Sequence, residues 1–258
     1  MQRILYKASL VIYKKPFFIL FCIWLIVQGI LLVSLGISTG KEAIKYSEEA
    51  NFFLSYHHFS EPKYIFYSAY ICLHIIFIQF GFETIGVYLI QLFANLLAMY
   101  LLFKIAFTLS KNILVAFLSV FLLLICYSWQ YWTVFLYTES FFCSLIIIFT
   151  YLLFGTTIRS KHYVIAAGFL FILIVLARPT GMLFIPVMYC LLMYKLVHER
   201  NFFYALASAI IISLIFFRIL NYALKGGSSY DFMKPLIENN VLCYIPEQSI
   251  TQDASFQK

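Results

Sequence analysis

Seven strongly apolar stretches divide this chain, and most of its few charged residues fall between them. Their bounds are 16–35, 84–103, 112–127, 133–154, 163–177, 181–194 and 202–220. A helix of about 20 apolar residues crosses a hydrocarbon layer about 30 Å thick, so the longer stretches fit as spans and the shorter ones as thin spans. Because 64% of the 258 residues are hydrophobic and 11% are charged, no soluble core of this size could bury the apolar side chains. We therefore expect an all-α protein, a polytopic transmembrane helical bundle with about seven spans.

Lysines and arginines decide the orientation of these spans. Residues 64–80 are apolar and aromatic enough to form a further span, but counting them as one would export most of the basic residues. If 64–80 lies along the membrane surface instead, the following residues all become cytoplasmic: Arg3, Lys7, Lys14, Lys15, Lys104, Lys111, Arg159, Lys161, Lys195 and Arg200. We therefore predict an integral, multi-pass protein of the cytoplasmic (inner) membrane, with its amino terminus inside.

The same orientation predicts a long first outer loop, from about residue 37 to residue 83. Polar side chains recur at helical spacing in its second half, at Tyr64, Tyr67, Tyr70 and His74. This spacing predicts a juxtamembrane helix with a polar edge at the interface. The chain then divides into a transmembrane domain, 1–220, and a polar extracytoplasmic tail, 221–258.

Several classes of partner and cofactor are disfavoured by the sequence. The net charge of +7 does not indicate nucleic-acid binding, because the basic residues lie between apolar segments, where they orient a membrane protein among its lipids. The six cysteines form no C-x-x-C motif, so neither a zinc site nor a disulfide framework is indicated. His57 and His58 are adjacent, and adjacent residues on a helix do not face one another. We therefore predict no cofactor, and a divalent metal is not indicated.

The start of the first loop carries a candidate general base. Read as a helix from Gly40, this segment has Glu42, Lys45, Tyr46 and Glu49 on one face. A carboxylate just outside a membrane, beside a lysine and a tyrosine, could take a proton from a substrate. The alternative interpretation is a solvated amphipathic helix with ordinary ion pairs.

Glu139 and Arg178 are the charged residues that stand out at the ends of later spans, and the predicted orientation places both on the outer face, where we expect them to border one outward-opening cavity with Glu42. In a helix that begins near Trp132, Glu139 would lie about 10 Å along the axis, at a depth where a carboxylate must face protein or water. Arg178 ends its helix before Pro179, and its forked donor set suits a phosphate or a carboxylate. The alternatives are a structural hydrogen bond for Glu139 and simple snorkelling for Arg178. Gln91 and Asn95 are expected to form hydrogen bonds between helices.

The order of several short motifs resembles the GT-C superfamily of polytopic glycosyltransferases. This group includes protein O-mannosyltransferases, aminoarabinose transferases and bacterial polyprenyl-phosphate-sugar enzymes. The resemblance covers roughly residues 37–186. It rests on Glu42, Tyr46 and Ala50, then Glu61-Pro62-Lys63-Tyr64 and Tyr67, Phe80-Gly81, Tyr137-Thr138-Glu139-Ser140-Phe141, and Ala177-Arg178-Pro179-Thr180-Gly181.

This resemblance implies transfer of a sugar from a polyprenyl-phosphate donor to a glycan, lipid or protein acceptor on the extracytoplasmic face. Glu42 would take the role of the first-loop acid that activates the acceptor hydroxyl, and Glu139 matches a recurrent acidic position at the outer end of a later span. The predicted catalytic residues are therefore Glu42 and Glu139. The predicted substrate-binding residues are Arg178, for the lipid phosphate, together with Tyr46, Lys45 and Glu49.

The sequence also departs from the superfamily's pattern. Glu42 stands where Asp is common, Lys41 stands where a paired acid often stands, and seven spans are few for the superfamily. Two further hypotheses therefore stay open. One is a lipid or sugar-lipid transporter or flippase, in which Glu139 and Arg178 line the path. The other is a truncated, non-catalytic homologue.

Overall fold

The computed structural model describes residues 15–154 and 161–198, together with 203, 206–207, 210–211, 213–215 and 217–218. Its elements are α2 (Pro16–Leu35), α3 (Lys41–Tyr56), η1 (Pro62–Tyr67), α4 (Ser68–Gln79), α5 (Glu83–Ser110), α6 (Ile113–Ile125), α7 (Tyr127–Tyr131), α8 (Thr138–Phe154), α9 (Lys161–Ala177) and α10 (Gly181–His198). All of these elements are helical, which confirms the predicted all-α class for this part of the chain. The predicted tail 221–258 lies outside the described residues, and of the predicted span 202–220 only short pieces are described.

Three helices, α2, α5 and α10, are long and apolar enough to cross a membrane. They coincide with three of the predicted spans, although α5 continues beyond residue 103 to Ser110, where Lys111 adopts a left-handed conformation with φ 54°. The apolar helices α6, α8 and Ile165–Ala177 are shorter than this length. The described residues therefore have the helices of a membrane protein, and the total number of spans stays a prediction.

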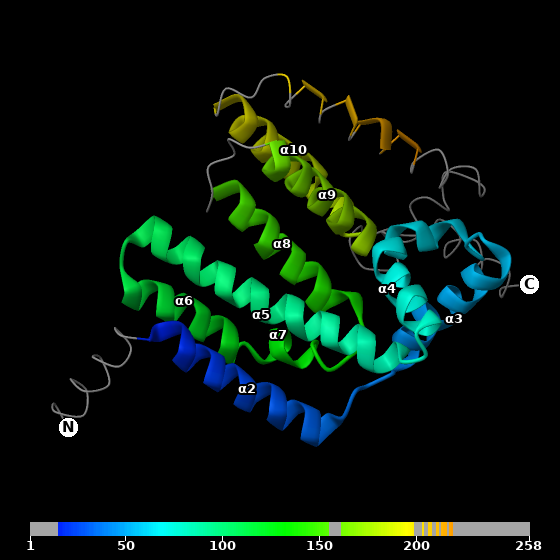
Figure 1. The fold of residues 1–258 in the computed structure, drawn as a ribbon, viewed down its shortest axis with the longest axis horizontal. Coiled ribbons are helices and arrows are strands. Elements are labelled where there is room, and N and C mark those ends of the chain that lie inside the picture. Colours follow the sequence, from blue (N-terminus) through cyan, green and yellow to red (C-terminus); the bar gives the residue numbers. More distant parts are fainter. Residues whose placement is uncertain are drawn as a thin grey trace, which may run out of the picture.

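The helices run side by side, and successive ones alternate in direction (Figure 1). Packing follows the order of the chain: α5 contacts α6 and α8, and α9 contacts α8 and α10. The helices α3, η1 and α4 gather at one end of this bundle, which we name the α3–α4 end. The last turn of α9 and the first turns of α5, α8 and α10 lie at this end, and α2 ends on the same side of the bundle. The basic residues Lys15, Lys111 and Lys195 lie on helix termini at the opposite end.

The segment that was predicted to lie along the membrane surface forms η1 and α4. With 12 residues, α4 is about 18 Å long, which is too short to cross a hydrocarbon layer of about 30 Å. The predicted polar edge is wrong, however, because Tyr70 and His74 are buried. Their rings pack against one another and against Tyr46 of α3, with centroids 5.1–6.4 Å apart.

The helix that carries Glu139 begins later than the sequence predicted. Residues 133–137 are not part of α8, because this segment pairs with Ser38 after α2. The amide of Ser38 donates to the carbonyl oxygen of Val134 at 2.9 Å, and the amide of Leu136 donates to the carbonyl oxygen of Ser38 at 3.2 Å. Since α8 begins at Thr138, Glu139 lies in its first turn. The predicted depth of about 10 Å within a helix from Trp132 is therefore wrong.

Buried amide side chains connect the helices inside the bundle. The indole of Trp24 donates to Asn95 at 2.8 Å, and the hydroxyl of Tyr70 donates to Gln91 at 2.9 Å. These contacts confirm the interhelical roles predicted for Asn95 and Gln91. A second network was not foreseen: the amide of Gln28 donates to Gln130 at 2.7 Å, and the hydroxyl of Thr133 lies 2.6 Å from the amide oxygen of Gln28.

Candidate functional site

An ion pair between Glu139 and Arg178 lies at the α3–α4 end. Nη1 of Arg178 is 2.9 Å from Oε1 of Glu139, and each side chain is 22% exposed. Neither the second carboxylate oxygen of Glu139 nor Nε of Arg178 has a hydrogen-bond partner among the described residues, and both atoms are buried. Buried polar atoms of this kind require water or a ligand. The predicted proximity of the two residues is thus confirmed, and the pair keeps hydrogen-bonding capacity for a further partner.

Tight local structure fixes both members of this pair. Pro179 follows Arg178 and favours the end of α9, because proline cannot continue a helix without losing a hydrogen bond. At Gly181, the first residue of α10, a Cβ atom would lie 2.4 Å from the carbonyl oxygen of Ile174, so only glycine allows this turn to pack so closely. Glu139 lies in the first turn of α8, where the helix dipole favours a carboxylate.

Tyr46 of α3 is affected by the charges of both candidate catalytic carboxylates. Burial raises the pKa of its hydroxyl well above the ordinary value, and the neighbouring Tyr67, Glu42 and Glu139 raise this pKa further, although a hydrogen bond with Thr138 opposes them. The phenol therefore stays protonated at any physiological pH. Tyr46 can orient a group by hydrogen bonding, but it cannot serve as the general base.

Tyr137 provides a second connection between Glu42 and Glu139. Burial raises the pKa of its hydroxyl, as do the charges of Glu42 and Glu139, while a hydrogen bond with the backbone of Glu42 lowers it. The same hydroxyl lies where a Cβ atom on Gly40 would be only 2.5 Å away. Tyr137 therefore holds the start of α3 against the start of α8, which brings the exposed Glu42 into the neighbourhood of the ion pair.

The four residues predicted to share one face of α3 differ in their exposure to solvent. Glu42 and Lys45 are exposed, whereas Tyr46 and Glu49 are buried. Both carboxylate oxygens of Glu49 are engaged by Ser60: the Ser60 amide donates to Oε1 at 2.7 Å, and the Ser60 hydroxyl donates to Oε2. These contacts close the segment that connects α3 with η1. A role for Glu49 or Lys45 at a substrate stays a prediction.

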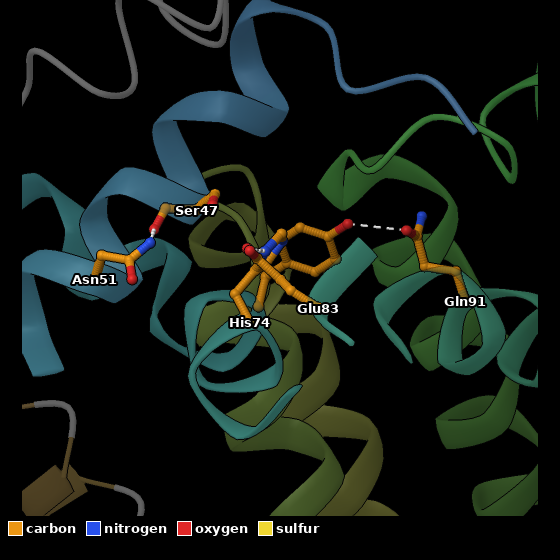
Figure 2. A network of polar contacts seen from close by, with 6 residues as sticks. Ser47, Asn51, His74, Glu83 and Gln91 are labelled. Carbon is orange, nitrogen blue, oxygen red and sulfur yellow. Dashed lines mark hydrogen bonds and ion pairs between the residues drawn. The ribbon is translucent and has the colours of Figure 1, made fainter. Parts of the chain in front are cut away.

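A network of polar contacts connects α3 with α4 and α5 next to the candidate site (Figure 2). Nδ1 of His74 lies 2.6 Å from Oε1 of Glu83, which also accepts a hydrogen bond from Ser47 of α3. Gln91 accepts from Tyr70 and donates, at 3.1 Å each, to the carbonyl oxygens of Phe135 and Tyr137. The network therefore joins α3, α4, α5 and the segment before α8.

The pair of His74 and Glu83 was not predicted from the sequence. A cavity of about 120 Å³ adjoins it and is lined by Ser47, Glu48 and Leu136, among others. A histidine inside an apolar helix was the one available signal, because such a residue is costly to bury without a partner. Its partner lies nine residues further on, across the turn between α4 and α5, and the sequence spacing alone does not indicate that contact.

No metal site is evident in the described part of the chain, where no group of three or more His, Cys, Asp or Glu side chains is placed to hold an ion. His57 ends α3 in a left-handed conformation with φ 58°. The ring of His58 stacks on Phe52, with centroids 5.4 Å apart. The two histidines therefore have different structural environments, and their adjacency in sequence does not create a common site.

The site brings together an exposed carboxylate, a protonated phenol and a paired guanidinium at one end of an apolar bundle. Such a set can accept a proton, orient a hydroxyl group and bind an anion. In comparisons with known protein families, with curated proteins and with solved structures, nothing matches the chain. Any assignment of function therefore rests on the chemistry of the site and on the order of the sequence motifs.

Proposed function

We propose that the chain is a GT-C-type membrane glycosyltransferase, which transfers a sugar from a polyprenyl-phosphate donor to a glycan, lipid or protein acceptor. The observation that carries this proposal is the grouping of three charged residues at the α3–α4 end. Arg178 and Glu139 form an ion pair, and Glu42 and Glu139 act electrostatically on the same two tyrosines, Tyr46 and Tyr137. The order of motifs that resembles the superfamily supports the same conclusion.

The proposed reaction assigns one task to each group. Glu42 accepts the proton of the acceptor hydroxyl as its oxygen attacks the anomeric carbon of the sugar. The bond between that carbon and the phosphate oxygen breaks, and the polyprenyl phosphate leaves with the electron pair. Arg178 stabilises the phosphate through charge-assisted hydrogen bonds. Glu139 pairs with the guanidinium while no donor is bound, and the protonated Tyr46 orients the sugar or the acceptor. A single displacement of this kind inverts the anomeric centre.

The proposed orientation places the α3–α4 end outside the cytoplasmic (inner) membrane. It is supported by the short length of α4 and by the lysines at the opposite end of the bundle, Lys15, Lys111 and Lys195. In this arrangement about seven spans make up a transmembrane domain, 1–220, followed by an extracytoplasmic tail, 221–258.

Cysteine labelling will test the orientation. In a variant without native cysteines, we expect a membrane-impermeant maleimide to modify single cysteines at Trp129 and Ser229 from outside the cell. Cysteines at Lys104 and Lys161 should react only after the membrane is permeabilised. Modification of Lys104→Cys or Lys161→Cys in intact cells would show that the orientation is wrong.

The transferase activity is best tested with the purified chain in phospholipid vesicles. A series of polyprenyl-phosphate hexose and pentose donors would be incubated with candidate acceptors, and release of free polyprenyl phosphate would be measured. We expect release that depends on both the protein and an acceptor. Movement of the intact donor across the bilayer without release would instead favour a flippase. Binding with neither release nor movement would favour a non-catalytic homologue.

A further inference from the structure

A groove of about 410 Å³ lies at the end of the bundle opposite the proposed active site. The first turn of α2, the last turns of α5 and the last turn of α8 form its walls. Phe17, Phe103 and Phe107 give the groove an aromatic lining. A single lysine, Lys104, lines it as well, and no acidic residue does so among the described residues. The groove therefore combines an apolar surface with one positive charge.

Polar groups are concentrated around Lys104. Its ammonium nitrogen lies 4.6 Å from the ring centroid of Tyr100, and the two side chains also form a hydrogen bond. The hydroxyl-bearing residues Thr108 and Tyr151 line the same groove. The Lys104 residue is partly buried, and its ammonium group lies at the mouth of the groove beside the Tyr100 ring. An ammonium group among hydroxyl donors is suited to bind an anion.

The position of Lys104 along α5 favours a membrane lipid as the source of that anion. With 28 residues, α5 is about 42 Å long, which exceeds a hydrocarbon thickness of about 30 Å. If Glu83 lies at one interface, about 20 residues of helix reach the other interface close to Lys104. The lysine then lies at the level of the lipid headgroups, with Phe17 and Phe103 on its bilayer side and Phe107 one helical turn further out.

The acidic residues are confined to one end of the bundle, which supports the same inference. Every acidic residue in the described part of the chain lies at the α3–α4 end: Glu42, Glu48, Glu49, Glu61, Glu83 and Glu139. The opposite end carries Lys15 before α2 and Lys111 after α5, whereas Lys41, Lys45 and Lys63 lie among the acidic residues. An anionic headgroup therefore meets no described carboxylate near the groove, and its binding is favoured electrostatically.

We propose that this groove binds an anionic glycerophospholipid of the surrounding bilayer. Lys104 and the hydroxyl groups of Tyr100, Thr108 and Tyr151 surround the headgroup phosphate, while the acyl chains follow the aromatic lining. The aromatic walls distinguish a lipid from free phosphate, which has no apolar part to bury. The site lies at the other end of the bundle from the proposed donor site, so it does not depend on sugar transfer.

Lipid binding can be measured on the purified full chain in a neutral detergent. Phosphatidylglycerol, phosphatidylcholine with the same acyl chains, and inorganic phosphate would be titrated separately, and bound lipid would be counted by native mass spectrometry alongside the unfolding midpoint. We expect phosphatidylglycerol to bind more tightly than phosphatidylcholine and to raise the midpoint more. Inorganic phosphate should leave the midpoint unchanged. Lys104→Gln should weaken phosphatidylglycerol binding about fivefold, the effect expected for one lysine near an anionic headgroup.

Lys111→Asn is the matched control, because it removes the same charge at the same end of the same helix. Asparagine also tolerates the left-handed conformation of Lys111, so this variant should fold normally and bind phosphatidylglycerol like the parent chain. Equal losses in the two variants would show unspecific attraction to the surface and overturn the proposal. Equal binding of the two lipids, or equal stabilisation by inorganic phosphate, would overturn it as well. If Lys104→Gln fails to fold, Thr108→Val keeps the side-chain shape and should still reduce the preference for phosphatidylglycerol.

Discussion

Replacing Glu42 with glutamine is expected to lower the rate of sugar transfer by about 10²- to 10⁴-fold, the contribution typical of a positioned general base. The amide keeps the size of the side chain and part of its hydrogen bonding, but it cannot accept the proton of the acceptor hydroxyl. Binding of the lipid donor should change little, because Arg178 and not Glu42 is proposed to contact the phosphate. Initial rates of polyprenyl phosphate release and a separate donor-binding assay will distinguish the two effects.

Two neighbouring glutamates of α3 provide controls. Glu48 is exposed on the same helix, and Glu48→Gln should leave the transfer rate close to that of the parent chain. Glu49→Gln should lower the unfolding midpoint, because it disturbs the two hydrogen bonds from Ser60. If Glu49→Gln is stable but inactive while Glu42→Gln is active, the general base is Glu49, about two helical turns further along α3. If neither substitution slows an active parent chain, a first-loop carboxylate mechanism is wrong.

The sequence predicted the helices well because their apolar patterns are long and their breakers are strong. Pro16–Leu35 was predicted with the bounds that the structure shows. The break between α9 and α10 was also foreseen, since Pro179 and Gly181 are strong local signals. The start of α8 was missed because residues 133–137 are as apolar as the helix that follows. Their non-helical conformation includes a pairing with Ser38, about a hundred positions away, and local propensity carries no information on that pairing.

The candidate site was also predicted only in part. Glu139 and Arg178 were assigned to one face because each lies at a helix end with known direction, and the structure confirms that they meet. The difference in exposure along α3 was not foreseen, because a helical face does not show which neighbour covers it. Tyr46 is buried by the aromatic side chains of η1 and α4, and those contacts require the tertiary fold.

Arg178→Ala is the second substitution with a large expected effect. It should weaken binding of the polyprenyl-phosphate donor by about ten- to a hundredfold, which corresponds to the loss of one or two charge-assisted hydrogen bonds. Arg178→Lys should recover part of the affinity, because it restores the charge but not the forked geometry. Donor binding can be followed by native mass spectrometry or by a filter assay in detergent, without any need for turnover.

Glu139→Gln separates a phosphate-binding role of Arg178 from a purely structural one. This variant breaks the ion pair but keeps the arginine, so the guanidinium loses its competing anion and donor affinity should be maintained or raised. If the pair serves only to fasten α8 to the turn after α9, Glu139→Gln and Arg178→Ala should weaken donor binding and stability to the same extent. A double-mutant cycle on the free energy of unfolding measures how much the ion pair contributes to stability. For residues in direct contact the interaction energy is typically about 0.5–3 kcal/mol. A loss of donor affinity confined to the Arg178 variants is the result that assigns this arginine to the lipid phosphate.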